Sequence, residues 1–227
     1  MATVAEARAP EAMTRNSVVL DDVSWDEYEA QLRIVGDRHV RVNYDAGRME
    51  IMSPLRRHGS GALVLGRMVD ILVEELDIPH EAADPVTLKR PDLLKGVEPD
   101  KLYHLRENAA RVQEPREFDF LIDPPPDLII EVDVTSSSVP RLPIFAALGI
   151  PEVWRVEGDE LRFLHLQSDG TYQPRDRSPA FPVLTLAEAA RFLEAGQRPG
   201  SKTAWMKSFR AFVREVLLPR LDEAGGA

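Results

Sequence analysis

Acidic residues recur at alternating positions in the segment PPPDLIIEVDVTSSS, which covers residues 124–138. Residues 127–135 are rich in β-branched side chains, lack Gly and Pro, and are flanked by Pro and Ser, which predicts a β-strand. Because side chains alternate between the two faces of a strand, Asp127, Glu131 and Asp133 share one face with Ile129. The other face carries the aliphatic residues Leu128, Ile130, Val132 and Val134. The strand therefore combines an apolar face with an acidic face.

Two interpretations of this acidic face are open. A carboxylate is costly to bury without a partner, so these acids must contact water, basic groups or a cation. Mg²⁺ prefers oxygen ligands and commonly binds one or two carboxylates together with water and phosphate oxygens. The acidic face is therefore either a metal site or an exposed sheet surface with ordinary charges.

A second acidic segment, GVEPDKLYHL, precedes this strand in the chain and favours the metal site. Residues 99–105 read as a strand, and Glu98 and Asp100 lie at its start. If the two strands are antiparallel neighbours, Asp100 lies close to Glu131. Two carboxylates from adjacent strands can hold a divalent cation that polarises a phosphate and lowers the pKa of an attacking water. The chemistry that this pattern predicts is hydrolysis of a phosphodiester bond.

The composition indicates one large globular domain in a reducing compartment. The chain has 227 residues, of which 44% are hydrophobic and 29% charged, and it contains no Cys, which excludes disulfides and thiolate metal sites. Its net charge of −10 argues against a simple electrostatic grip on nucleic acid, although a local basic face is compatible with that charge. No uncharged apolar run approaches the roughly 20 residues that span a bilayer, so we expect a cytoplasmic protein without membrane contact.

The first half of the chain contains signals for a helix, a hairpin and a second helix. The capping-box pattern SWDE at Ser24 opens a short helix through about Ile34, and alternating runs on both sides of residues 45–47 predict a β-hairpin. Helical spacing of apolar residues predicts a helix over 60–76. A strand is expected near 84–89, and the polar, Pro-rich stretch 107–127 reads as a connection.

The second half alternates in a similar way. We expect a short helix over 142–148, then strands over 151–157 and 160–167 joined by a tight turn, and a helix after Thr185. Ser136, Ser137 and Ser138 are interpreted as caps for the helix that follows them. Trp154 and Tyr103 are interpreted as core aromatics.

The last predicted helix, over 202–220, has an apolar stripe and a basic stripe. The basic residues Lys207, Arg210 and Arg214 are either solvated or contact a DNA backbone. These patterns divide the chain into three predicted parts. They are a disordered tail (1–16), one domain (17–200), and a C-terminal amphipathic helix (201–227) that packs on the domain or on a partner subunit.

Four segments together resemble the Uma-two family, and the likeness covers roughly residues 22–175. They are GRMEIMSP followed by His58, then GVEPDKLYHL, PPPDLIIEVDVTSSS and FAALGIPEVWRVEGDELRFLHL. The resemblance implies an α/β, restriction-endonuclease-like fold of the PD-(D/E)XK nuclease superfamily, in which helices flank a mixed β-sheet. It further implies metal-dependent cleavage of DNA, with Asp100 as the leading aspartate and Glu131 as the acid of the ExK element. Both would bind Mg²⁺ or Mn²⁺.

The ExK element departs from the family pattern at its third position, where Asp133 stands in place of lysine. A lysine there orients or activates the water and neutralises developing charge, and an aspartate cannot supply that charge. Arg141 lies near the start of the following helix, where related sequences place the missing base. Arginine is too basic to accept a proton and only stabilises charge. Two functions therefore stay open: a metal-dependent endonuclease, or a catalytically silent nuclease-fold protein that acts as a binding or regulatory module.

Two further residues are candidates for the same site. Glu50, on the predicted hairpin, is either the additional acid that many such nucleases carry or a surface glutamate. His58 either contacts phosphate and shuttles a proton or is structural. A homodimer would suit an enzyme that cuts both strands of DNA.

Overall fold

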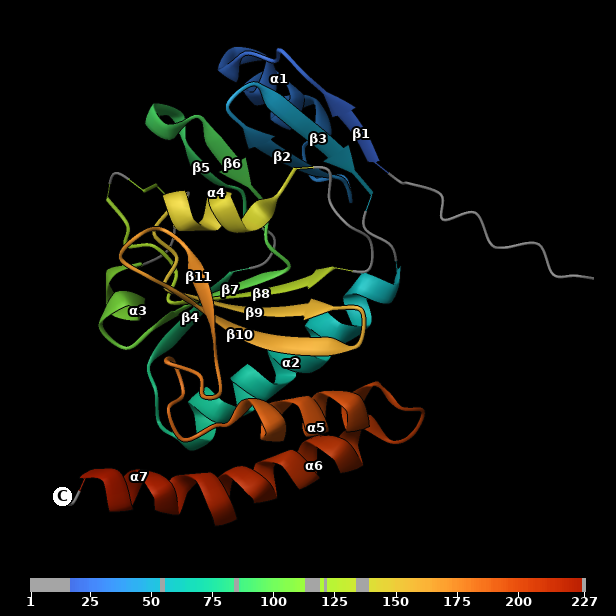
Figure 1. Cartoon of the computed structure of the whole chain (residues 1–227). Coiled ribbons are helices and arrows are strands. Elements are labelled where there is room, and N and C mark those ends of the chain that lie inside the picture. Colours follow the sequence, from blue (N-terminus) through green and yellow to red (C-terminus); the bar gives the residue numbers. More distant parts are fainter. Residues whose placement is uncertain are drawn as a thin grey trace, which may run out of the picture.

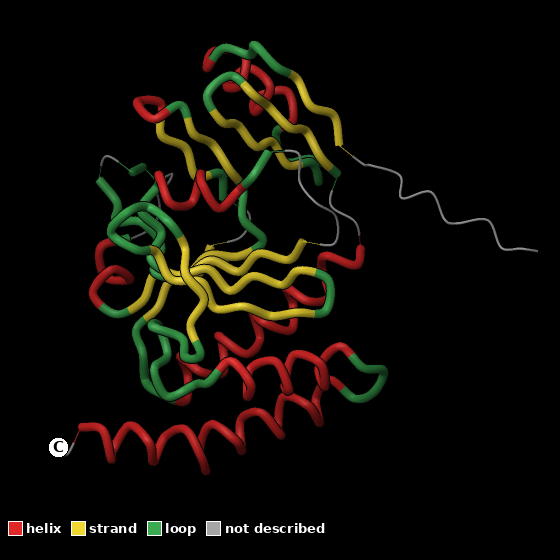
Figure 2. The backbone as a smooth tube through the Cα atoms, viewed as in Figure 1, coloured by secondary structure: helices red, strands yellow, loops and turns green. Residues whose placement is uncertain are grey.

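The chain folds into two β-sheets with a short helix between them (Figures 1 and 2). The computed structural model describes residues 17–53, 56–83, 86–112, 119–120, 122–133 and 139–225. The predicted α/β fold, a mixed sheet flanked by helices, is confirmed. The second sheet was not distinguished by the sequence patterns, and the expected tail over 1–16 lies outside the described residues.

The central sheet has six strands in the order β11-β10-β9-β8-β7-β4. The strands are β4 (His80–Ala83), β7 (Lys101–Leu105), β8 (Leu128–Asp133), β9 (Glu152–Glu157), β10 (Glu160–Leu166) and β11 (Tyr172–Arg175). Among the strand pairs of the described residues, only β8 and β9 are parallel within this sheet, which makes it mixed. The expected antiparallel pairing of β7 with β8 is confirmed, because Lys101 lies opposite Ile130.

The main hydrophobic core lies on one face of this sheet. That face is covered by α2 (Arg56–Glu75), α5 (Leu186–Gln197) and α6 (Lys202–Phe212) (Figure 1). Leu128, Ile130 and Val132 point into this core, as their alternation predicts, and the predicted core aromatics Trp154 and Tyr103 are buried there. The capping box at Thr185 begins α5, as predicted.

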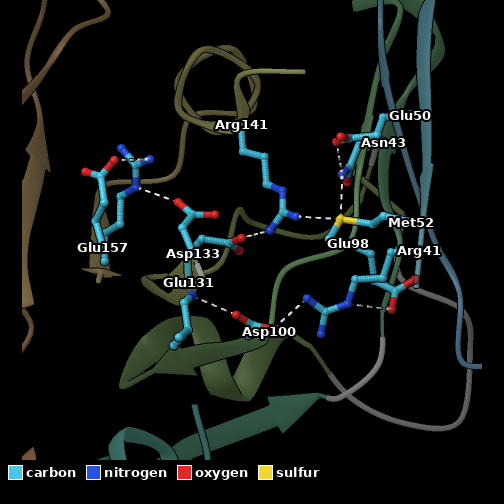
Figure 3. Close-up of polar contacts among 12 residues, drawn as sticks. Arg41, Asn43, Glu50, Met52, Glu98, Asp100, Glu131, Asp133, Arg141 and Glu157 are labelled. Atoms are coloured by element: carbon cyan, nitrogen blue, oxygen red, sulfur yellow. Dashed lines mark hydrogen bonds and ion pairs between the residues drawn. The ribbon is translucent and has the colours of Figure 1, made fainter. Parts of the chain in front are cut away.

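The opposite face of the central sheet packs against α4 (Arg141–Ala147). Ile129 of β8 contacts this second core together with Ile144 and Phe145 of α4. Both faces of β8 are therefore buried, and the acidic side chains of the strand point toward α4 rather than toward open solvent (Figure 3).

The second sheet has five strands in the order β1-β3-β2-β6-β5. They are β1 (Ser17–Leu20), β2 (Arg41–Asp45), β3 (Arg48–Met52), β5 (Leu88–Arg90) and β6 (Lys95–Val97), with a 3-10 turn at Pro91–Leu93. The predicted hairpin of β2 and β3 is confirmed. One face of this hairpin buries Val42, Tyr44 and Met49 against α1 (Trp25–Val35), whose predicted capping box at Ser24 is present.

Three expected boundaries differ from the structure. Of the strand expected near 84–89, residues 84 and 85 lie outside the described residues, and its end belongs to β5, which joins the five-stranded sheet, whereas the preceding strand β4 belongs to the central sheet. The helix expected from Ser60 begins four residues earlier, at Arg56. The connection 107–127 contains a short helix, α3 (Glu107–Arg111), which ends at the polar stretch.

The C-terminal helix continues through a π-helical turn (Val213–Leu217) into α7 (Leu218–Gly225). Its apolar stripe packs on the domain, where Phe209 and Leu217 are fully buried. Arg210 and Arg214 form ion pairs with Glu75 of α2, at 2.6 and 2.5 Å. Two residues of the predicted basic stripe, Arg210 and Arg214, therefore pair with an acid of the same chain, and the third, Lys207, is exposed.

Candidate active site

A cluster of buried charged and polar side chains lies where the two sheets and α4 meet (Figure 3). The residues come from the inward face of the hairpin β2–β3, from the connection between β6 and β7, from β8 and β9, and from the start of α4. The members are Arg41, Asn43, Glu50, Met52, Glu98, Asp100, Glu131, Asp133, Arg141 and Arg155. Five carboxylates thus share a buried region with three guanidinium groups.

Glu131 and Arg141 form the most deeply buried ion pair of the cluster. Oε1 of Glu131 contacts Nη1 of Arg141, and the side chains are 1% and 6% exposed. Oε2 of Glu131 is buried without a hydrogen-bond partner among the described residues, as is Nε of Arg141. Nη2 of Arg141 donates to the sulfur of Met52 at 2.9 Å. Burial lowers the pKa of Arg141 from its ordinary value, and the nearby carboxylates of Asp100 and Glu50 oppose that shift.

Asp100 lies beside the same strand, as the antiparallel pairing predicts. Its Oδ2 accepts a hydrogen bond of 2.7 Å from the backbone N–H of Val132, and its Oδ1 accepts one of 2.5 Å from Nη1 of Arg41. Nε of Arg41 lies 3.6 Å from Glu98. The Asp100 side chain is 4% exposed. Both of its oxygens therefore accept their hydrogen bonds in a region almost without solvent.

Asp133 has a different partner, Arg155 of the parallel strand β9. Arg155 lies opposite Glu131 in the register, and its Nε donates to Oδ2 of Asp133 at 2.8 Å. Burial raises the pKa of Asp133, and the hydrogen bond from Arg155 opposes that rise. An arginine from the neighbouring strand thus supplies positive charge near the place where the family pattern has lysine.

Glu50 is buried, with 1% of its surface exposed, so its interpretation as a surface glutamate is wrong. It lies opposite Asn43 across the hairpin, and Nδ2 of Asn43 lies 3.5 Å from its Oε2. The interpretation of Glu131 as an acid on an exposed sheet face is also wrong, because Glu131 is equally buried.

The remaining sequence candidates are not part of this cluster, or lie beyond what the structure describes. Asp127 was expected on the acidic face, but its carboxylate accepts hydrogen bonds from the Leu105 N–H and from Asn108, at 2.7 and 2.8 Å. It therefore links the residue before β8 to the end of β7 and to α3. His58 lies in the first turn of α2, and its side chain is outside the described residues. Ser136, Ser137 and Ser138 are also outside them.

Arg41, Asn43 and Arg155 belong to the cluster but were not singled out from the sequence. Arg41 and Asn43 alternate with Val42 and Tyr44 along β2, so period-two alternation places them on the hairpin face opposite α1. That signal was present once the hairpin had been recognised. Arg155 had no comparable signal, because its approach to Asp133 depends on the parallel pairing of β8 with β9.

The donor set suits a hard cation held by two carboxylates. No group of three or more acidic or histidine side chains is arranged to hold a metal within the described part of the chain. Mg²⁺, however, commonly uses only one or two carboxylates and completes its shell with water and phosphate oxygens. Glu131 has a buried oxygen without a hydrogen-bond donor among the described residues, whereas both oxygens of Asp100 already accept hydrogen bonds. Glu131 and Asp100 would be the two carboxylate ligands of such an ion, and Asp100 would exchange its Arg41 contact for it.

Two comparisons with known proteins found matches. A crystal structure titled as a putative nuclease belonging to DUF820, from Anabaena variabilis ATCC 29413, has 16% sequence identity and a TM-score of 0.49 over 67% of this chain and 90% of that chain. None of the curated proteins matches the chain. In the described segments, no helix has both the length and the apolar character that a membrane span requires. The model of the Uma2 family, described as "Putative restriction endonuclease", matches residues 25–194. Because this match covers most of the chain, the protein belongs to the Uma2 family.

Proposed function

We propose that this protein is a metal-dependent DNA endonuclease whose centre is formed by Asp100 and Glu131. The observation that carries the proposal is the convergence between the sheets of three buried carboxylates, Glu50 of β3, Glu131 of β8 and Asp100, which directly precedes β7. A domain does not bury several acids without a compensating function or partner, because each buried charge costs several kcal/mol, roughly, when unpaired. Membership of a restriction-endonuclease-like family supports DNA as the substrate.

Each side chain has a defined role in this proposal. Asp100 and Glu131 would hold Mg²⁺ or Mn²⁺, which when bound polarises a phosphate and lowers the pKa of a coordinated water. Arg141 and Arg155 supply the positive charge that lysine provides in the family pattern, because a guanidinium stabilises developing negative charge. Neither arginine accepts a proton. Glu50 is therefore our candidate for the proton acceptor, with Asp133 as a positioning residue that holds Arg155.

Plasmid cleavage tests this proposal. Supercoiled plasmid is incubated with Mg²⁺ or Mn²⁺ and wild-type protein, Glu131→Gln, Asp100→Asn, or the control Glu160→Gln, whose side chain is 64% exposed on the β10 hairpin. Wild type and control should nick or linearise the plasmid, and EDTA should stop them. Each of the two site variants should be slower by about 100-fold or more, a typical cost of removing a group that stabilises the transition state. Equal cleavage by all four proteins contradicts the proposal.

A second function is favoured by a specific observation, namely that both proposed ligands already have cationic partners. Arg41 engages Asp100 and Arg141 engages Glu131, which is also the arrangement expected of a catalytically silent binding or regulatory protein. Calorimetric titration with Mn²⁺ separates the two functions. Binding that Asp100→Asn abolishes supports the endonuclease, and absence of binding at millimolar Mn²⁺ supports the silent protein.

A further inference from the structure

Arg41 and Arg141 engage the two carboxylates that we propose as ligands, and they do so from different elements. Arg41 reaches Asp100 from β2 of the five-stranded sheet, and Arg141 reaches Glu131 from the first residue of α4 (Figure 3). The two arginine side chains are only 13% and 6% exposed. Each therefore gives up hydration in order to neutralise one acid.

Arg141 is poorly satisfied by its surroundings. Of its five N–H donors, one is directed at the sulfur of Met52, a weak acceptor, and its buried Nε has no hydrogen-bond partner in the described structure. Attraction to the buried acids is what holds Arg141 in this position, and that attraction weakens once another cation neutralises them.

We infer that Arg41 and Arg141 are exchangeable counter-ions, which neutralise Asp100 and Glu131 in the metal-free protein and bind DNA phosphate in the metal-loaded one. This inference rests on the function proposed above. A guanidinium and a divalent cation compete for the same carboxylate oxygens, because like charges repel at short range. Once displaced, Arg41 keeps its contact of 3.6 Å with Glu98 and Arg141 stays near Glu50, but each guanidinium has five N–H donors, more than these contacts use. A phosphodiester offers two oxygens in the geometry that a guanidinium fork matches.

Exchange of counter-ions predicts effects of opposite sign on metal and on DNA. Removal of one guanidinium removes a competitor of the metal, so the Kd for Mn²⁺ should fall by about fivefold or more, at the low end of usual coupling between sites. The same removal deletes a phosphate contact, so duplex DNA should bind more weakly and the salt dependence of log K should become shallower by about one unit. A residue that merely stabilises the fold would weaken both kinds of binding.

The experiment uses the full chain with Arg41→Gln, Arg141→Gln, Arg41→Lys and the control Arg162→Gln, whose side chain is 44% exposed on β10. Mn²⁺ affinity is measured by calorimetry. Binding of a fluorescein-labelled duplex is measured by anisotropy in Ca²⁺ at several salt concentrations, with the duplex verified as intact afterwards. Circular dichroism confirms that each variant is folded. If Arg141→Gln does not fold, Arg41→Gln and Arg41→Lys complete the test, because Lys keeps the competing charge and should leave the Mn²⁺ affinity near that of wild type.

Tighter Mn²⁺ binding together with weaker duplex binding in the Gln variants, and no change in the control, supports the inference. Mn²⁺ affinity that is unchanged or reduced in Arg41→Gln overturns it, as does tighter Mn²⁺ binding with unchanged affinity for the duplex. A wild-type protein that binds Mn²⁺ and DNA while the Gln variants behave like wild type refutes only the exchange. A wild-type protein that binds neither ligand refutes the proposed function and the exchange together.

Discussion

The ion pair between Glu131 and Arg141 makes an asymmetric prediction about stability. Both side chains are buried, so removal of one partner leaves a charge in a region that water does not reach. Such a loss typically costs about 3–5 kcal/mol in the free energy of unfolding. We expect the full cost for Arg141→Met, because Glu131 then keeps neither of its carboxylate oxygens paired within the described structure.

The converse change should cost less. In Glu131→Leu, Arg141 remains attracted to Asp100 and Glu50, which already act on its charge. We expect this variant to lose about 2 kcal/mol less than Arg141→Met, since partial compensation persists. In the double variant, two apolar side chains replace the pair, and such replacements are often neutral in stability. The double variant should therefore be more stable than Arg141→Met alone.

Urea unfolding of the four proteins at pH 7 measures this cycle. The coupling energy between positions 131 and 141 should be about 2 kcal/mol or more, whereas independent sites add to within about 0.5 kcal/mol. Additive losses would show that the two side chains do not interact as the structure has them. A larger loss for Glu131→Leu than for Arg141→Met would refute the role assigned to Asp100 and Glu50 as remaining partners of the arginine.

Three further predictions concern the scaffold around the site. Burial raises the pKa of Glu152 from 4.5 to about 7, so its contribution to stability is complete below about pH 4.5 and is lost as the pH rises through about 7. The free energies of unfolding from urea titrations at pH 5 and pH 8 should differ by up to about 3 kcal/mol more in wild type than in Glu152→Gln, and parallel pH profiles would contradict this. Gly196→Ala would place Cβ 2.6 Å from Val64 of α2 and 2.9 Å from Trp205 of α6. The free energy of unfolding should therefore fall by about 1–3 kcal/mol and the melting temperature with it; an unchanged melting curve would show that α2 and α6 move away from α5 without loss of stability. Phe209→Ala should lower the free energy of unfolding by about 3–5 kcal/mol, because Phe209 is fully buried where α6 packs on the domain. A decrease below about 1 kcal/mol in a urea titration would mean that Phe209 does not anchor the C-terminal helix.

The elements that periodicity and caps define were predictable from the sequence. Capping boxes at Ser24 and Thr185 begin helices where expected, and the alternation in β8 separates Ile130 from Glu131 as predicted. These signals are local, because a side-chain oxygen that accepts a backbone N–H acts within one turn and the strand repeat acts within two residues. The buried strand β8 and the hairpin of β2 and β3 were predictable for the same reason, because the alternation that predicts them is also local.

The arrangement of the two sheets was not predictable in the same way. The strands β4 and β5 are four and three residues long and lie in different sheets, although only a short stretch of chain separates them. Nothing local encodes which sheet such a short strand joins, because the choice depends on distant partners. The partners of the acids were not predictable for the same reason. Arg41 and Asp100 are 59 positions apart in the sequence, and their contact forms only after both sheets have assembled.

The central claim is that Asp100 and Glu131 form the metal centre of an endonuclease, and a crystal soaked with Mn²⁺ tests it most directly. Anomalous difference density at the manganese edge locates the ion without reference to any assay of cleavage. We predict a single strong peak within coordination distance of carboxylate oxygens from both Asp100 and Glu131, with Arg141 moved away from Glu131. Density that leaves both carboxylates on their arginines, with no peak between them at saturating Mn²⁺, would contradict the account.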